Sequence, residues 1–503
     1  MKPSKAILPL QTLSLVLGFA VWGILSSLIV FIKDGILLTP SQLSLVTAVP
    51  IVLGSILRVP FGYWTNRFGA RWMFLISFIV LLAPVFYISK ATSFADLIIG
   101  GLFLGVAGAT FSVGVTSLPK YYPQEKHGFV NGIYGLGNIG SALSTFFAPV
   151  MANQFGWRTT VQFYLILLIF FALANFFVGD KKEKKSTVPL MEQFKAIYRN
   201  EKLWLICLFY FITFGSFVAF TIFLPNFLVQ HFGISKVDAG LRTAVFVVLA
   251  TIMRPVGGIL GDKFNPFKIL IYVFSGLTVG GILLAFSPSI MLYTVGCLLI
   301  GLCAGIGNGT IFKLVPLYFS KQAGIANGLI SALGGLGGFF PPLMLTLLFG
   351  ITGHYAIGFM ALAMVALCSL LLVLYLYWQD KVKLAEQIIQ STSQAILVTN
   401  KKGIIINVNP AYTAVTGYTA EMAIGQKSGF LKSGRHDKAF YESMWKQLKE
   451  NNAWSGEIWN KKKNGEIFLQ HISINAVQSD VGETSYYVGV FTEVEPSSQR
   501  FPK

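Results

Sequence analysis

Charged residues are scarce in this sequence. They make up 12% of its 503 residues, whereas a soluble domain averages about 25%. Apolar runs of about 20 residues, the length that crosses a bilayer, follow one another along the chain. The composition excludes an ordinary soluble protein and predicts an all-α polytopic membrane protein. We predict twelve spans, at about residues 9–32, 41–63, 71–89, 94–118, 127–150, 158–179, 203–231, 240–260, 267–286, 289–317, 323–349 and 355–378.

Cysteine is also rare. The sequence has four cysteines, and all of them lie within predicted spans. This placement gives no sign of a disulfide or a metal site, and the thiols are expected to pack as small apolar groups. They are Cys207, Cys297, Cys303 and Cys368.

The net charge of +18 is explained by topology. Seven Lys and Arg lie in residues 180–202, whereas the outer loops carry five. Because basic residues collect on the cytoplasmic side, both termini are predicted to be cytoplasmic in a protein of the inner (plasma) membrane. No nucleic-acid partner is needed to explain the charge. The first span is too long for a cleavable signal and is expected to remain. The five outer residues are Lys33, Lys90, Arg158, Lys236 and Arg242.

The first 379 residues repeat at an offset of 196. Arg58 pairs with Arg254 (254 − 58 = 196), and Asn66 pairs with Asp262. This predicts a membrane domain at 1–379, with parallel halves at about 1–180 and 200–379. In secondary transporters built from repeats, the substrate site lies between the repeats. Further matched pairs are Gly62 and Gly258, Gly105 and Gly301, Tyr122 and Tyr318, Gly128 and Gly324, and Asn131 and Asn327.

Arg58 and Arg254 interrupt apolar runs at equivalent places in the two halves. One interpretation is that each side chain extends to the nearby cytoplasmic interface. Helical side chains lean toward the helix N-terminus, however, and in these two spans that end is the outer one. The guanidinium groups should therefore point into the membrane. Since an intramembrane charge is by default a functional group, we expect both arginines to bind substrate.

No acidic residue is placed to neutralise these arginines. All nine Asp and Glu of the first 379 residues fall in loops or at span ends. The missing partner is therefore predicted to be the cargo, a small anion. A planar guanidinium suits a planar oxyanion because it donates two parallel hydrogen bonds. Asn138, an amide among small and apolar residues, is expected either to hydrogen-bond the anion or to link two helices.

Two glycine-rich segments, residues 131–149 and 327–342, lie in corresponding spans of the two halves. Small residues let helix backbones approach closely. Helix packing accounts for most of these glycines, and we expect them to act in packing and gating. The glycines concerned are Gly135, Gly137, Gly140, Gly334, Gly335, Gly337 and Gly338.

The motifs "GLGNIG" and "GGLGGFFPP", with "LRVP" and "MRPVGG" around the arginines, resemble the nitrate/nitrite porter family of the major facilitator superfamily. The resemblance covers nearly all of residues 8–379 and is closest to assimilatory nitrate transporters. It implies the major facilitator fold, with nitrate or nitrite clamped by Arg58 and Arg254 and hydrogen-bonded by Asn138. It also implies that an aromatic wall lines the cavity, formed by Phe19, Phe111, Tyr210 and Phe214.

The loop of residues 62–71 resembles the superfamily's signature loop between its second and third helices. Asn66 stands where that signature usually has an aspartate, whereas the second half keeps the aspartate as Asp262.

The sequence shows no obvious residue that would couple transport to an ion gradient. Import of an anion against an inside-negative potential costs about 2.3 kcal/mol per 100 mV, so it requires a co-transported proton or an exchanged anion. Lys313 is the one other intramembrane charge, and it is expected either to take part in coupling or to reach the interface. Proton symport and nitrate/nitrite exchange both remain open.

Residues 380–503 contain no apolar span. Residues 380–394 are predicted to form a helical linker. Short strands and a hairpin turn at 463–465 then predict a small α+β domain at 395–503. The segments 403–426 and 454–477 resemble a PAS sensory domain.

The PAS resemblance leaves the cofactor unknown, since such domains bind flavin, haem, small metabolites or nothing. The tail contains no cysteine, which excludes the covalent flavin chemistry of the light-sensing subgroup. His436 is a candidate haem ligand, although a lone histidine in a polar segment is more often simply exposed. Transport itself requires no cofactor.

These features predict a transporter of nitrate and nitrite, not an enzyme, which the PAS domain modulates or connects to a cytoplasmic signalling partner. Two alternatives stay open. The cargo could be another small oxyanion such as formate, bicarbonate or a short carboxylate. The protein could also be a transporter-like receptor that signals through its tail.

Overall fold

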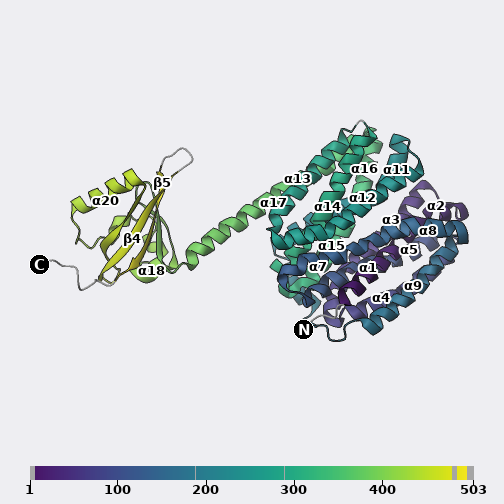
Figure 1. The fold of residues 1–503 in the computed structure, drawn as a ribbon, viewed down its shortest axis with the longest axis horizontal. Helices are drawn as coiled ribbons and strands as arrows, with labels where there is room; N and C mark the ends of the chain where they lie inside the picture. Colours follow the sequence, from purple (N-terminus) through teal and green to yellow (C-terminus); the bar gives the residue numbers. More distant parts are fainter. Residues whose placement is uncertain (1–5, 187, 288, 479–483, 495–503) are drawn as a thin grey trace. The chain divides into compact units, whose positions relative to one another are not determined.

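The computed structural model describes residues 6–186, 188–287, 289–478 and 484–494. The chain forms two compact units that meet between Tyr377 and Trp378. The described residues of the first unit are helices and loops, whereas the second unit contains an antiparallel sheet (Figure 1).

The first unit has the predicted major facilitator architecture, in which two sets of helices follow one another along the chain. A short helix, α10 (Leu190–Ile197), lies between the sets. The first set is α1 (Ile7–Trp22), α2 (Ile24–Gly35), α3 (Pro40–Phe68), α4 (Ala70–Ser89), α5 (Phe94–Ala109), α6 (Phe111–Ser117), α7 (His127–Gly135), α8 (Ile139–Phe155) and α9 (Trp157–Val178). The second set is α11 (Glu201–Phe232), α12 (Lys236–Lys263), α13 (Pro266–Ala285), α14 (Ile290–Tyr318), α15 (Ala323–Leu336), α16 (Phe340–Thr352) and α17 (Tyr355–Ser391).

Within the described residues, ten helical stretches are long and apolar enough to cross a membrane. The fifth and eleventh predicted spans are instead divided into shorter helices at their glycine-rich segments. A 3-10 turn, η3 (Leu136–Asn138), separates α7 from α8, and residues 337–339 separate α15 from α16. The twelve predicted spans are all helical; besides these two, the first is broken at Gly23 between α1 and α2, and the fourth at Thr110 between α5 and α6.

Helix boundaries follow the local sequence. Ser93 begins α5 with a reciprocal cap, in which its hydroxyl accepts from the backbone N of Asp96 at 3.2 Å and the Asp96 carboxylate accepts from the backbone N of Ser93 at 2.9 Å. Such a box satisfies two N–H groups that have no partner inside the helix. Gly233 and Gly353 end α11 and α16 with φ of +67° and +71°, a conformation that glycine adopts without strain.

Close backbone contacts explain the glycine-rich segments. A Cβ atom at Gly140 would lie 1.9 Å from the carbonyl oxygen of Val16, and one at Gly337 would lie 2.1 Å from that of Phe211. No larger residue fits at either position without moving a neighbouring helix. Both glycines therefore lie where two helix backbones come close together.

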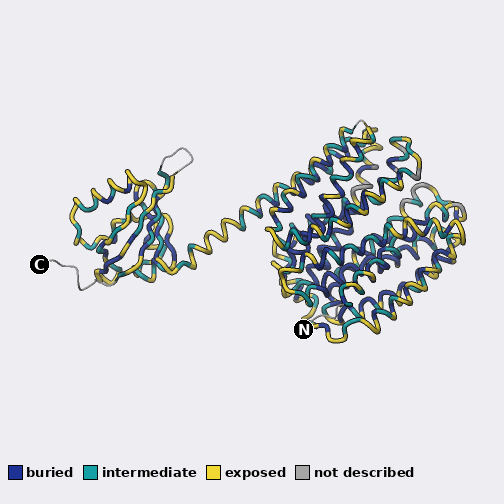
Figure 2. Tube along the Cα trace, viewed as in Figure 1, coloured by how far each residue is buried: buried dark blue, intermediate teal, exposed yellow. Residues whose placement is uncertain are grey.

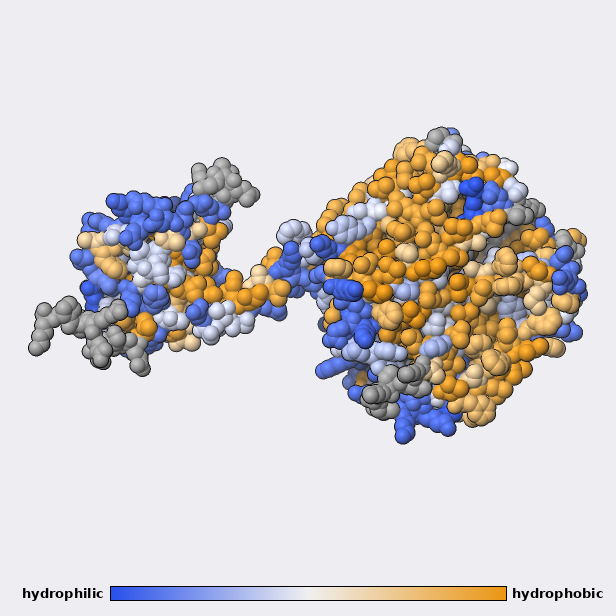
Figure 3. Space-filling view, viewed as in Figure 1, coloured by the Kyte–Doolittle hydropathy of each residue, from blue (hydrophilic) through white to orange (hydrophobic). Residues whose placement is uncertain are grey.

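The surface of the first unit is apolar over a broad area (Figure 3). Exposed large side chains lie along α9, including Ile166, Phe170 and Phe177. The burial pattern in Figure 2 places the buried residues of this unit where its helices face one another. An apolar exterior of this extent is expected of a surface that faces lipid rather than water.

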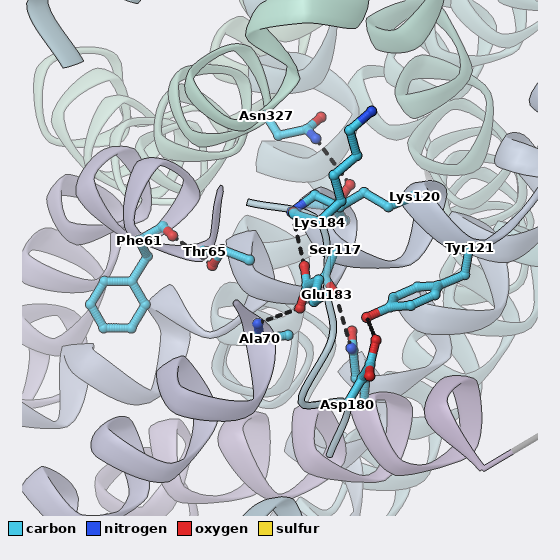
Figure 4. A network of polar contacts seen from close by, with 12 residues as sticks. Phe61, Thr65, Ala70, Ser117, Lys120, Tyr121, Asp180, Glu183, Lys184 and Asn327 are labelled. Carbon is cyan, nitrogen blue, oxygen red and sulfur yellow. Dashed lines mark hydrogen bonds and ion pairs between the residues drawn. The ribbon is translucent and has the colours of Figure 1, made fainter. Parts of the chain in front are cut away.

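The connection that follows α9 is bound to the first half by a polar network around Glu183 (Figure 4). The buried Glu183 side chain lies 2.9 Å from Lys120 Nζ and accepts a 2.7 Å hydrogen bond from the backbone N of Ala70, where α4 begins. A carboxylate at a helix N-terminus is stabilised by the helix dipole. Asp180 accepts a further bond of 2.8 Å from the Tyr121 hydroxyl. This network fixes the start of the basic connection between the halves.

The second unit is an α+β domain with a five-stranded antiparallel sheet in the order β2-β1-β5-β4-β3. The helix α20 (Lys438–Asn451) covers one face of the sheet (Figure 1), together with the shorter α18 (Pro410–Thr416), α19 (Ala420–Ala423) and η5 (Ser428–Leu431). The predicted hairpin turn is present between β3 and β4, where Gly465 has a φ of +90°. The strands are β1 (Ala395–Asn400), β2 (Ile405–Val408), β3 (Ala453–Lys461), β4 (Ile467–Gln478) and β5 (Thr484–Glu493).

The end of α17 is attached to the sheet through Asn409. Its side-chain oxygen accepts from the backbone N of Ile396 at 2.8 Å, and its side-chain nitrogen donates to the carbonyls of Gln394 at 2.8 Å and Ile389 at 3.2 Å. One buried amide thus holds together the last turn of the helix, the first strand and the loop after the second strand.

Candidate functional site

Arg58 on α3 and Arg254 on α12 lie against the same pair of aromatic rings. The Cζ atom of each arginine is 5.5 Å from the centre of the Phe111 ring and 5.3 Å from that of Phe214. Phe111 begins α6 in the first half, and Phe214 lies on α11 in the second. Each arginine is only 2% exposed, so neither guanidinium extends to an interface. The site is formed where the two halves meet.

Neutral groups are the hydrogen-bond acceptors around these arginines. Arg58 donates from Nη1 to the carbonyl of Ser331 at 2.6 Å and from Nε to that of Gly108 at 3.3 Å. Arg254 donates from Nη2 to the Tyr210 hydroxyl at 2.8 Å, while its Nη1 is buried without an acceptor. No ion pair to a carboxylate involves either arginine in the described part of the chain. The two positive charges therefore lie in the same region of the protein, where the dielectric constant is low.

Aromatic side chains enclose the arginines. The Tyr210 ring stacks on Phe214, with centroids 5.1 Å apart and an interplanar angle of 6°. Phe312, on α14, packs edge-on at 4.9 Å from Tyr210 and 5.4 Å from Phe111. The resemblance placed three of these rings here but not Phe312, whose only sequence signal is its position next to Lys313.

Phe19 differs from the other predicted aromatic residues. It is fully buried on α1, and its described ring contact is with Trp22, at a centroid distance of 5.4 Å. No described ring contact joins it to Phe111, Tyr210 or Phe214. The structure thus stacks three of the four predicted aromatic residues together, whereas Phe19 contacts Trp22, whose indole lies beside Gly108.

Asn138 is fully buried in η3. Neither its side-chain nitrogen nor its side-chain oxygen has a hydrogen-bond partner among the described residues. The alternative role of a bond between helices therefore finds no support here. Leaving a buried polar group without a hydrogen bond costs about 1–3 kcal/mol of stability. A ligand that formed a hydrogen bond with Asn138 would remove this cost.

The predicted glycines make room for the site. A Cβ atom at Gly135 would lie 3.2 Å from Nε of Arg254, and one at Gly335 would lie 3.1 Å from Nη1 of Arg58. Gly135 and Asn138 are three residues apart on one helical segment, so they share a face. The other predicted glycines pack against apolar or aromatic residues: Gly137 against Leu15, Gly140 against Val16, Gly334 against Tyr210, Gly337 against Phe211, and Gly338 against Val218.

Lys313, the remaining intramembrane charge, is buried in an ion pair. Its Nζ lies 2.7 Å from Oδ1 of Asp262 and also donates to the carbonyl of Gln124. The same carboxylate accepts from the backbone N atoms of Gly128 at 2.9 Å and Phe129 at 2.7 Å, at the start of α7. We call these five residues the Asp262 latch. It connects α12 and α14 of the second half to α7 of the first, and it holds the Lys313 ammonium in an ion pair.

The corresponding crossing of α3 and α15 carries no such charge. A Cβ atom at Gly324 would lie 2.3 Å from Nδ2 of Asn66, and one at Gly62 would lie 2.2 Å from the Gly324 carbonyl. The backbones approach as closely as at the latch, where a Cβ at Gly258 would lie 2.1 Å from the Gly128 carbonyl. The two crossings differ chiefly because Asn66 stands where the repeat has Asp262.

The second unit contains a separate cavity of about 380 Å³ between the sheet and α20. Its described lining residues include no cysteine and no histidine, so they do not fit a haem held by histidine or a thiol-linked flavin. The Nε2 atom of His436 accepts a 3.0 Å hydrogen bond from the backbone N of Trp459, and its ring stacks on Phe440 at 4.0 Å. Burial lowers the pKa of this imidazole. The ring is therefore held within the fold outside the cavity.

We expect Asp262→Asn to loosen the crossing of α7 and α12, because asparagine cannot neutralise Lys313. Removing one partner of a buried ion pair costs about 3–5 kcal/mol. A cysteine introduced at the buried Asn131 of α7 should then react with a maleimide several times faster. The measurement is made in a background with Cys368, the exposed cysteine, replaced by serine.

The matched control for this prediction is Asn66→Ala, which alters the uncharged crossing and should have a smaller effect. Adding Lys313→Met to Asp262→Asn should return the labelling rate toward the parent value, since no charge is then left unpaired. Equal labelling rates in the parent and Asp262→Asn proteins would show that the latch does not hold the crossing.

Comparison with protein families gives two matches. The profile of the Major Facilitator Superfamily matches residues 12–342, and that of the PAS domain matches residues 393–495. The second match confirms the predicted sensory domain.

Curated relatives match the first unit at high identity. The nitrite extrusion protein of Bacillus subtilis is 64% identical over 376 residues, which cover 75% of this chain and 95% of that protein. The probable nitrate transporter NarT of Staphylococcus epidermidis is 54% identical over 381 residues, covering 76% of this chain and 98% of that one. About a quarter of this chain thus lies outside each match.

A solved structure supports the fold. The human organic anion transporter MFSD10 (TETRAN) aligns with a TM-score of 0.63 and 15% identity, covering 74% of this chain and all of that one. At this identity the likeness concerns the fold alone. With the profile match and the close relatives, it confirms the family predicted from the sequence: the chain belongs to the Major Facilitator Superfamily and carries a C-terminal PAS domain.

Proposed function

We propose that this protein transports nitrate and nitrite across the membrane by alternating access, with the anion held between Arg58 and Arg254. One observation carries the proposal: two buried guanidinium groups share an aromatic pair, and no carboxylate neutralises them. The names of the relatives, a nitrite extrusion protein and a probable nitrate transporter, support the choice of these two anions.

The anion supplies the charge that the arginines lack. Nitrate and nitrite are flat, and a guanidinium donates two parallel hydrogen bonds to such a group. The buried Nη1 of Arg254 and the side-chain nitrogen of Asn138 have no acceptor in the described structure, so both are free to donate to an oxygen of the anion. The Tyr210 hydroxyl, which accepts from Arg254, keeps its own proton available for the same purpose.

The aromatic rings limit the size of the cargo. Phe111, Phe214 and Phe312 pack around the two arginines, and the Phe111 ring contacts the other two at centroid separations of 6.3 and 5.4 Å. Because these rings are already in contact, a small planar anion requires less rearrangement to reach the arginines than a bulky carboxylate does. The anion crosses without chemical change.

We assign residues 1–379 to transport, 380–394 to a helical linker and 395–503 to sensing. The charge pattern of the loops supports a multi-pass protein of the inner (plasma) membrane with both termini in the cytoplasm. In this orientation the Asp262 latch lies on the cytoplasmic side. We therefore assign Lys313 to closure of that side rather than to proton coupling.

Flux into proteoliposomes tests the proposed function. Labelled nitrate is added outside vesicles that contain the purified protein, with or without nitrite inside and with or without a pH gradient. Acceleration by internal nitrite indicates exchange, and acceleration by an inward proton gradient indicates symport. An excess of formate, bicarbonate or acetate should compete poorly. Absence of nitrate flux under every condition would refute the proposal, and complete inhibition by formate would assign the cargo to another oxyanion.

Replacing either substrate arginine by lysine should abolish most transport. Arg58→Lys and Arg254→Lys keep the charge but lose the planar pair of donors. Each lost hydrogen bond to a charged partner contributes about 1.5–3 kcal/mol, which corresponds to a loss of roughly tenfold or more in kcat/KM for nitrate uptake. Arg242→Lys is the matched control, because Arg242 is paired with Asp238 and lies outside the site. Near-normal uptake by both site variants would contradict the arginine clamp.

Asn138→Ala should weaken nitrate binding without destabilising the protein. The side chain has no partner in the described structure, so its removal breaks no internal bond. We expect KM for nitrate to rise by roughly tenfold at an unchanged melting temperature. Asn175→Ala should instead lower the melting temperature and leave KM for nitrate unchanged. Asn175 donates to the Ser14 hydroxyl at 2.8 Å, so its loss affects packing. An unchanged KM with lower stability in Asn138→Ala would assign Asn138 to packing.

We further propose that the PAS domain modulates transport through α17. That helix continues from the first unit to Ser391, and Asn409 holds its last turn to the sheet. Ending the chain after Trp378 should leave nitrate flux intact and remove its response to cytoplasmic conditions such as redox state. A flexible glycine-serine insertion between Lys383 and Ile388 should uncouple the two in the same way. Identical responses of the full and shortened proteins would indicate a separate signalling partner.

A further inference from the structure

Residues 180–185, which follow α9, contain four lysines and two acidic residues. The acidic side chains are held against the protein: Asp180 accepts a hydrogen bond of 2.8 Å from the Tyr121 hydroxyl (Figure 4). The side chain of Glu183 is 2% exposed and forms an ion pair of 2.9 Å with Lys120. The four lysines are instead exposed, namely Lys181, Lys182, Lys184 and Lys185. The segment therefore presents mainly positive charge to its surroundings.

The backbone of this segment is fixed by bonds that do not use the exposed ammonium groups. The side chain of Glu183 accepts a 2.7 Å hydrogen bond from the backbone N of Ala70, the first residue of α4. The backbone N of Ser186 donates to the carbonyl of Asn66 at 2.8 Å. The four exposed ammonium groups form no hydrogen bond or ion pair within the described part of the chain. Four charges without a counter-charge are thus held on one short, anchored segment.

An apolar edge lies beside the segment, where the start of α4 packs on the end of α9. Arg71 donates from Nε to the carbonyl of Phe176 at 2.9 Å, and its Cζ lies 4.9 Å from the centre of the Phe176 ring. The Trp72 ring packs edge-on against the same phenylalanine at 6.2 Å. Trp72 is 42% exposed and Phe177 is 70% exposed. Because tryptophan rings gather at the level of the lipid headgroups, this edge suits contact with lipid.

We propose that the four exposed lysines of residues 181–185 bind the headgroup of an anionic phospholipid. The phosphate lies among the lysines, and the acyl chains extend along Trp72 and Phe177. In the orientation proposed above, the lipid belongs to the cytoplasmic leaflet, whose anionic lipids attract a polybasic segment beside a membrane span. A soluble phosphate would leave the aromatic edge unused, and a zwitterionic lipid would bring another ammonium group among the lysines.

The preference of basic residues for the cytoplasmic side accounts for the presence of these lysines. It does not account for the burial of Glu183 or for the anchored backbone, which together leave a surface of one charge. This lipid site does not depend on which anion the protein transports.

Native mass spectrometry of the full-length protein in a neutral detergent tests the lipid site. The protein is titrated with dioleoylphosphatidylglycerol. The zwitterionic reference is dioleoylphosphatidylcholine, and glycerol 3-phosphate represents the free headgroup. We expect the anionic lipid to bind about tenfold more tightly than either of the other probes, because several lysines contribute to its binding. No transport is measured, so the result is independent of the proposed cargo.

Variants locate the binding. The combined variant Lys181→Gln, Lys182→Gln, Lys184→Gln and Lys185→Gln should lose most of the preference for the anionic lipid. The matched control removes the same charge from four other exposed lysines and should keep the preference. It combines Lys126→Gln, Lys195→Gln, Lys268→Gln and Lys321→Gln. Melting temperatures establish that each variant folds.

Glu183→Gln tests the anchoring of the segment. It leaves every lysine in place and makes the protein more positive. It should nevertheless weaken binding of the anionic lipid severalfold, because the ion pair with Lys120 no longer holds the segment in place.

Four results would overturn the proposal. The first is that phosphatidylcholine binds as tightly as phosphatidylglycerol. The second is that the control variant loses as much affinity as the variant of the segment, which would mean that net charge alone attracts the lipid. The third is that folded Glu183→Gln binds the anionic lipid at least as tightly as the parent protein does. The fourth is that glycerol 3-phosphate binds as tightly as the lipid, which would assign the lysines to a soluble phosphate.

Discussion

The structure of the first unit depends on two positive charges that are buried close to one another without a negative charge. Desolvation of an ion is costly, and two like charges repel strongly where the dielectric constant is low. The fold accommodates Arg58 and Arg254 with neutral oxygens, from backbone carbonyls and the Tyr210 hydroxyl, and with the faces of Phe111 and Phe214. These groups hold the arginines in place but do not neutralise them, and so the site retains its attraction for an anion.

The glycine-rich helices follow from this arrangement. A guanidinium group needs space beside a helix, and Gly135 and Gly335 provide it because a side chain there would meet Arg254 or Arg58. The same helices cross α12 and α3 at backbone distance, which ties movement of the crossings to movement around the arginines. The crossings are not equivalent, however. Asp262 and Lys313 hold one of them by an ion pair, whereas the other has the neutral Asn66 and a hydrogen bond from Arg58 to the Ser331 carbonyl.

The two units differ in how they arrange buried polar groups and positive charges. In the first, two positive charges are buried and only neutral oxygens accept their hydrogen bonds. In the second, an apolar cavity contains one unsatisfied amide, Gln470, and Lys402, Lys427 and Lys432 are placed along its lining. The α17 helix runs from one unit into the other, and Asn409 fastens its last turn to the sheet. The backbone between the two units is therefore one helix.

The sequence by itself determined the spans, the repeat, the two arginines and the absence of a carboxylate near them. These features lie in hydropathy, spacing and residue type, which need no knowledge of how helices cross. The tertiary structure decided the rest, because contacts between distant helices depend on their rotation and register. It added Phe312, set Phe19 against Trp22, left Asn138 without a partner among the described residues and paired Lys313 with Asp262. The Ser331 carbonyl that holds Arg58 could not have been found from the sequence, since every residue has such an oxygen and only the packing of α15 against α3 brings this one to the site.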